Sequence, residues 1–148
     1  MALFRCKKKK EPQLTYYGTA TNLSVARSYL TATTVSNYAL FGGGESDEER
    51  YDNVVDAYNT SLTRSTPTAL SAGRTNLAAT AIGDYALFGG GDSYSSSNKV
   101  DAYNTSLTRS TPTALSASRG GLAATTVGNY ALFGGGIWSD VVDVYTLA

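Results

Sequence analysis

One heptapeptide constrains this chain more than any other feature, because it divides the sequence into repeats. The sequence YALFGGG occurs three times, at residues 38–44, 85–91 and 130–136. An identical seventeen-residue block, DAYNTSLTRSTPTALSA, follows the first two copies at residues 56–72 and 101–117, and a shorter form, VDVYT, follows the third at residues 142–146. The chain is therefore built from one structural unit used repeatedly.

Each unit reads as four short β-strands. A segment of small and β-branched residues, such as LAATAI at 77–82, precedes YALFGGG, and the VDAY and LTRSTPT segments follow it. Two residues suited to a tight hairpin separate the first two strands, as Ser36-Asn37, Gly83-Asp84 and Gly128-Asn129. Four antiparallel strands recurring about every 45 residues are typical of a propeller blade, so the sequence predicts an all-β fold.

The variation between the repeats is confined to one segment of each. From the tyrosine of VDAY to the phenylalanine of the next YALFGGG there are 30 residues in both cases. From that phenylalanine to the following strand tyrosine there are 17, 15 and 12 residues in the three repeats. The length changes therefore fall in three loops, at residues 45–53, 92–98 and 137–140, whose sequences share almost nothing.

The repeat resembles the kelch repeat. It has a hydrophobic strand ending in consecutive glycines, a variable loop, a tyrosine closing the next strand and an arginine opening the next blade, and the likeness covers Leu14–Ala148. The tryptophan usual after the kelch tyrosine is absent, and Leu62 and Leu107 are the nearest apolar substitutes. In style the repeats are similar to short kelch-type proteins of gut Clostridia and their prophages. The resemblance implies a kelch-like β-propeller.

The strand count leaves this propeller open. One outer strand at 14–19, two sets of four strands and a last set of three make three four-stranded blades per chain. Since propellers close with roughly four to eight blades, we expect homodimerisation to give a six-bladed ring, although another even number is open. The 14–19 strand would then complete the last blade of the partner subunit, and residues 1–13 form a flexible, lysine-rich tail.

The bulk composition excludes several classes of function. Twelve acidic and twelve basic residues give no net charge, so nucleic acid is not an expected partner. There is no histidine, and Cys6 is the one cysteine, which argues against metal sites, cofactors and histidine-based catalysis, while an exposed Cys6 could cross-link two subunits. No membrane span or signal peptide is evident, so we expect cytoplasmic synthesis, with virion association if the gene is phage-borne.

The variable loops and the links between blades are expected at one rim, which is the candidate binding face. The sequence nominates seven ligand-binding residues there: Arg27, Arg74, Arg119, Tyr51, Tyr94, Asp92 and Trp138. The arginines recur identically, so their alternative role is to hold the links between blades through carbonyl or carboxylate contacts. Trp138 could stack on a ligand or pack at the subunit junction.

A rigid repeated frame with variable loops on one face predicts a non-enzymatic binding module for a glycan or a protein. The alternative is a structural or assembly component, associated with a phage virion, that Lys7–Lys10 would dock on its neighbour. An enzyme with a site on the propeller axis is a third hypothesis. No repeated pair of acidic residues nominates such a site.

Overall fold

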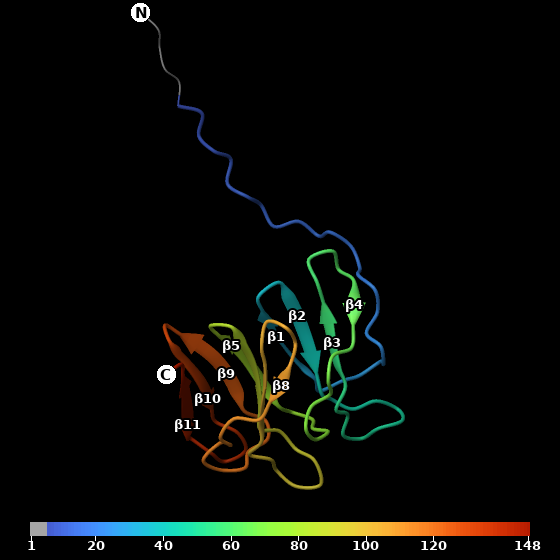
Figure 1. Ribbon diagram of the computed structural model, residues 1–148, viewed down its shortest axis with the longest axis vertical. Helices are drawn as coiled ribbons and strands as arrows, with labels where there is room; N and C mark the ends of the chain where they lie inside the picture. Colours follow the sequence, from blue (N-terminus) through green and yellow to red (C-terminus); the bar gives the residue numbers. More distant parts are fainter. Residues whose placement is uncertain (1–5) are drawn as a thin grey trace, which may run out of the picture.

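Eleven strands form three antiparallel sheets in the part of the chain that the structure describes, residues 6–148 of a computed structural model (Figure 1). The first sheet contains β1 (Thr31–Val35), β2 (Tyr38–Gly42), β3 (Val55–Tyr58) and β4 (Arg64–Ser65). The second contains β5 (Ala78–Ile82), β6 (Tyr85–Gly89), β7 (Val100–Tyr103) and β8 (Arg109–Ser110). The third contains β9 (Ala123–Val127), β10 (Tyr130–Gly134) and β11 (Val142–Thr146). The all-β prediction is confirmed, and the described chain has no helix able to cross a membrane.

Tight two-residue turns join the first two strands of each sheet, as the sequence predicts. Val35 pairs with Tyr38, Ile82 with Tyr85 and Val127 with Tyr130, each across a turn of two residues. The first turn residue has a positive φ in every case, at Ser36 (49°), Gly83 (52°) and Gly128 (54°). Turns of this hand match the twist of the flanking strands and so fix their register.

The three sheets stack side by side, and alternate residues of the second strands pack in opposite directions. Phe88 and Ala86 belong to the apolar cluster shared with the first sheet, whereas Leu87 belongs to the cluster shared with the third. The first strands β1, β5 and β9 lie next to one another where the sheets meet. The middle sheet is therefore covered on both faces, and the first and third sheets are each covered on one.

The fourth strands are shorter than the sequence predicts. Only Arg64–Ser65 and Arg109–Ser110 pair with their neighbours, although LTRSTPT suggests a longer strand. Pro67 and Pro112 follow two residues later and have no amide hydrogen to extend the ladder. The outer edge of each complete sheet thus ends in a short paired segment.

The third sheet has no fourth strand within the described chain. Its strand order is β11-β10-β9, so β11 pairs on one edge only. Residues 14–19, predicted as an outer strand, form no strand here, and residues 6–22 are exposed throughout. In Figure 1 the first part of this segment leads away from the sheets, whereas its end reaches the first sheet, where Thr21 O accepts from Tyr58 Oη and Asn22 O from Arg64 Nη1. Residues 1–5 of the predicted tail lie outside the described residues.

Candidate functional site

The glycine triplets turn the chain from the sheets into the variable loops. Gly43, Gly90 and Gly135 have φ values of 72°, 67° and 75°, a region that favours glycine. At Gly90 a Cβ would also lie 2.7 Å from the carbonyl oxygen of Arg119 in the next repeat. Glycine is thus required where the loop starts and the neighbouring backbone approaches closely.

Beneath the loops, each candidate arginine forms an ion pair with the aspartate of the VDAY or VDVY strand. The Arg74 Nη2 donates to Asp101 Oδ2 at 2.5 Å, and its Nη1 donates to the carbonyl oxygens of Gly90 and Lys99 at 2.8 and 2.9 Å. Both side chains of this pair are fully buried. The same arrangement is found for Arg27 with Asp56 and for Arg119 with Asp143. One guanidinium therefore ties together the link, the glycine loop and the third strand.

These contacts place the three arginines in the frame. Burial lowers the pKa of Arg74, and the charge of Asp101 opposes this effect. An arginine remains protonated under such a shift, so the pair is ionic. Asp92 is half-buried where the loop 92–98 begins: its backbone pairs with Thr75, and its carboxylate accepts from Ser96 Oγ of the same loop at 3.3 Å. Of the seven nominated residues, Tyr51, Tyr94 and Trp138 form none of these ion pairs, and Tyr94 and Trp138 are almost fully exposed.

The structure brings two of these aromatic residues together from different loops. The rings of Tyr51 and Tyr94 meet edge to face, with centroids 5.2 Å apart and an interplanar angle of 68°. The Arg50 guanidinium lies 5.4 Å from the centre of the Tyr51 ring, within the range of a cation–π contact. Tyr94 is 95% exposed, so most of its ring is available to a ligand.

A cavity of about 390 Å³ lies beside this aromatic pair. Its lining comes from the loops 45–53 and 92–98 and from the link between the first two sheets: Glu49, Arg50, Tyr51, Ala72, Gly73, Ser93 and Tyr94. Ala72 and Gly73 contribute small residues to this lining, and Glu49 and Arg50 add one charge of each sign. Glu49 belongs to an acidic stretch of the variable loop, residues 47–49, that sequence reasoning assigns to a solvated surface, and nothing in the sequence singles out Arg50. The positions of both residues depend on the loop turn that Ser46 N closes on Glu49 O at 2.8 Å.

Trp138 lies apart from this cavity, on the loop 137–140, which supplies none of the lining residues. Its side chain is 99% exposed and its φ is 58°. Trp138 stands four residues before Val142, as Tyr51 stands four residues before Val55. It therefore holds in the last repeat the place that Tyr51 holds in the first.

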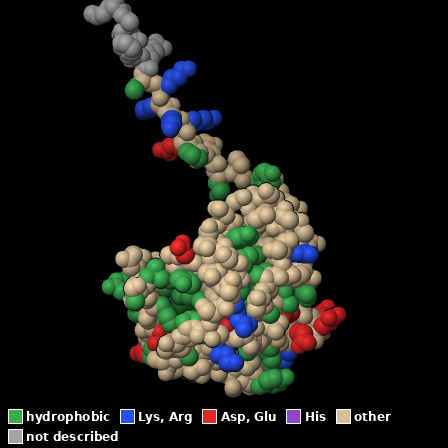
Figure 2. Space-filling model, viewed as in Figure 1, with side chains coloured by type: hydrophobic (Ala, Val, Ile, Leu, Met, Phe, Trp, Pro, Cys, Tyr) green, Lys and Arg blue, Asp and Glu red, His purple; other side chains and the backbone are tan. Residues whose placement is uncertain are grey.

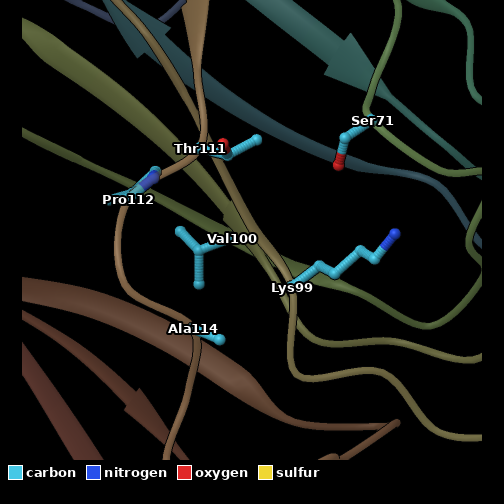
Figure 3. A pocket seen from close by; sticks show the side chains of 6 residues that line it. All are labelled: Ser71, Lys99, Val100, Thr111, Pro112 and Ala114. Carbon is cyan, nitrogen blue, oxygen red and sulfur yellow. The ribbon is translucent and has the colours of Figure 1, made fainter.

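A second cavity, of about 250 Å³, lies below the loops and has a different character (Figure 3). It is lined by Ser71, Lys99, Val100, Thr111, Pro112 and Ala114. Most of these residues belong to the blocks that the first two repeats share almost verbatim. Most of its lining therefore belongs to the frame, and Lys99 is the lining residue that varies, since Val54 and Val141 hold its place in the other repeats.

Between residues 6 and 148 no group of three or more potential metal-ligating side chains is found. Comparison with protein-family models and with curated proteins gave no match. The evidence for a function at the loop face is therefore its geometry: two aromatic rings, a flanking charge pair and a cavity between two variable loops.

Proposed function

We propose that the protein is a non-enzymatic binding module whose ligand, a glycan or a protein, contacts the face that carries the variable loops. The observation that carries the proposal is the cavity beside Tyr51 and Tyr94. An exposed aromatic ring beside an arginine and a glutamate offers an apolar surface for stacking and polar groups for hydroxyls or peptide groups. Glycans and protein side chains are both ligands of this chemistry.

The frame that we propose for this face is a kelch-like β-propeller with six blades, made by two chains. Three sheets in the strand order of a blade, stacked by their first strands, support it. We expect light scattering to give twice the 15.5 kDa chain mass over a wide range of concentration. A persistent monomer would contradict the ring but would leave the loop cavity untouched, since that cavity lies within one chain.

Binding is tested first by screening the purified protein on a glycan array and against a protein extract of the organism that produces it. Tyr94 is then substituted with serine. We expect Tyr94→Ser to weaken binding about tenfold or more, about 1.4 kcal/mol, because an exposed stacking ring is lost. Tyr85→Ser is the matched control, since Tyr85 is also exposed but begins β6, at the end of the strand away from the loops. Equal effects of the two substitutions, or no ligand in either screen, would overturn the proposal.

A second candidate, an assembly component, is favoured by one observation. Lys7–Lys10 are exposed and precede the sheets on an extended segment, so they can reach an acidic neighbour (Figure 2). Such a component would co-purify with structural proteins, and replacing the four lysines with serine would release it. Retention of the partner after that replacement would exclude docking by the tail.

A further inference from the structure

One face of the third sheet lacks the cover that its counterparts have. Val35, Val55 and Ala57 of the first sheet are 2%, 1% and 0% exposed, because the second sheet packs on them. The residues at the same places in the third sheet, Val127, Val142 and Val144, are 64%, 55% and 54% exposed. Figure 2 shows hydrophobic side chains gathered where β9–β11 lie. This face therefore has the apolar residues that bury against a following sheet at the other junctions, but no following sheet covers it in the described chain.

The glycine that ends β10 shows what the missing half would contribute. A Cβ at Gly42 would lie 2.8 Å from the ring of Phe88, and a Cβ at Gly89 would lie 2.7 Å from the ring of Phe133. Each of these glycines is thus the seat of a phenylalanine from the next sheet. Gly134 occupies the same place in the third sheet, but the nearest atom to its Cβ position is Val142 Cγ2 at 3.5 Å.

The phenylalanine that would fill this seat is present at the other end of the chain. Phe41 holds in β2 the place of Phe88 in β6, but within residues 6–148 no earlier sheet receives it, and it is only partly buried. Ser24, Arg27 and the rest of the link before β1 correspond to Ser71, Arg74 and the link before β5. The first sheet therefore carries the complementary half of the junction.

Backbone groups are left over at the same two places. At the existing junctions, Gly44 N donates to Arg74 O and Gly91 N donates to Arg119 O, both at 2.8 Å. By the same repeat, Gly136 N would donate to the carbonyl oxygen of an Arg27 in the link before a following first sheet. Within residues 6–148 Gly136 N makes no hydrogen bond of this kind. A following sheet would supply both the ring and the acceptor.

The exposed segment 14–19 precedes the first sheet as β4 precedes the second. In the complete sheets, Tyr58 pairs with Arg64 and Tyr103 with Arg109. The corresponding edge of β11, at Tyr145, has no partner in the described chain. Residues 14–19 are therefore suited to be the fourth strand of a preceding sheet, and the third sheet lacks a fourth strand. Both features would be satisfied at one junction.

We infer that a second copy of the chain covers the third sheet, with its Phe41 on Gly134 and its residues 14–19 paired with β11 as the fourth strand. The inference rests on the six-bladed ring proposed above and specifies how it closes. A twofold axis makes the junction twice, so each chain both gives and receives the segment. No edge of β11 then remains open to unwanted pairing.

A cysteine pair tests this junction directly. The Oγ atoms of Thr80 and Thr126 are 2.7 Å apart across the junction of the second and third sheets. The corresponding pair at the inferred junction is Thr125 of one chain and Thr34 of its partner, both exposed in the single chain. We expect Thr34→Cys with Thr125→Cys, in a Cys6→Ser background, to give a covalent dimer on a non-reducing gel.

Matched variants separate the possible outcomes. Thr80→Cys with Thr126→Cys should form its disulfide within one chain and leave the band at the 15.5 kDa chain mass on the non-reducing gel. That disulfide would show that the geometry allows the bond. Either Thr34→Cys or Thr125→Cys alone should give no cross-link. If light scattering shows a dimer but Thr34→Cys with Thr125→Cys gives no cross-link, this junction is wrong and the proposed ring is not contradicted. If light scattering shows a monomer, both the junction and the ring are wrong. Ligand binding by the loop cavity is measured separately and decides neither.

A single added methyl group provides the second test. Gly134→Ala has room within the chain, where the nearest atom is 3.5 Å away, but would crowd the partner's Phe41. We expect its circular dichroism to be unchanged and its dimer dissociation constant to rise about tenfold or more. Gly89→Ala is the matched control, because it should destabilise the chain itself. A Gly134→Ala variant that dimerises like the parent would contradict the seat proposed for Phe41.

Discussion

The second and third sheets are built from nearly the same sequence and yet differ in burial. The strand AATAI of β5 is largely buried, whereas AATTV of β9 is mostly exposed. VDAY of β7 is fully buried, but VDVYT of β11 alternates between exposed and half-buried residues. The strands, turns and registers are nevertheless the same. Local sequence therefore determines the sheet, and the neighbouring sheets determine how much each residue contributes to stability.

The buried ion pairs make this difference concrete. Arg74 and Asp101 approach to 2.5 Å with both side chains fully buried. Arg119 and Asp143 also approach to 2.5 Å, but the Asp143 side chain is 18% exposed, because no fourth strand or following sheet among residues 6–148 covers it. If the aspartate is removed, water can therefore solvate Arg119 but cannot reach Arg74.

Asp101→Ala should be the most destabilising substitution. It leaves the Arg74 guanidinium buried without a counter-charge, which costs about 3–5 kcal/mol of unfolding free energy. Asp143→Ala should cost less, about 1–3 kcal/mol, since Arg119 keeps its bonds to the carbonyls of Gly135 and Val141 and gains access to water. Urea denaturation of both variants at low protein concentration measures the difference.

Protein concentration sharpens this comparison. If a second copy covers the third sheet, Asp143 becomes buried like Asp101, and the two losses should converge as the concentration rises. Losses that stay apart at every concentration would show that the third sheet remains open.

Phe133→Ala should have a somewhat smaller effect. Phe133 is fully buried on Gly89 and against Tyr145, with ring centroids 5.8 Å apart, and truncation should cost about 3 kcal/mol, because Tyr145 at the open edge can move into part of the space. Phe41→Ala should cost the single chain about 1 kcal/mol, since this ring is only partly buried. Thermal unfolding monitored at several concentrations distinguishes the two. A Phe41→Ala loss as large as that of Phe133→Ala in a monomeric sample would contradict the structure.

The sequence predicted those parts of the fold that depend on local pattern. The hairpin turns and the three-stranded last sheet are confirmed, because turn chemistry and the strand pattern are local properties. Residues 14–19 form no strand, because within residues 6–148 no free strand edge lies beside them.

The site was harder to predict than the frame. The recurring aspartate of the third strand was a signal for the arginine partners, but only the fold shows that Asp56, Asp101 and Asp143 lie within reach. The loop cavity depends on Arg50 stacking on Tyr51 and on the approach of Tyr94 from another loop. Loops of different length and sequence carry no repeat from which such contacts could be read.

The smallest expected effect concerns the tyrosine hydroxyls, and it separates the same two sheets by pH. The hydroxyl of Tyr103 donates to Thr68 O at 2.7 Å, and that of Tyr145 donates to Thr113 O at 2.7 Å. Burial raises the pKa of both phenols, with Asp101 and Asp143 as the second causes, and the rise is large for Tyr103. In the unfolded chain both tyrosines ionise near a pH of about 10, while the fold shifts their ionisation to higher pH.

The stability that these phenols contribute is therefore fully present below pH ~10 and is lost as the pH rises from there through the folded-state pKa of each group. Tyr103→Phe should cost about 1 kcal/mol at neutral pH through its lost hydrogen bond and should flatten the decline of stability above pH ~10. Tyr145→Phe should do the same to a smaller extent in the single chain, because its hydroxyl is closer to water. Denaturation curves between neutral pH and pH ~11 measure both slopes. If the two variants flatten the decline equally in dimeric samples and unequally in monomeric ones, the second copy buries Tyr145 as β8 buries Tyr103.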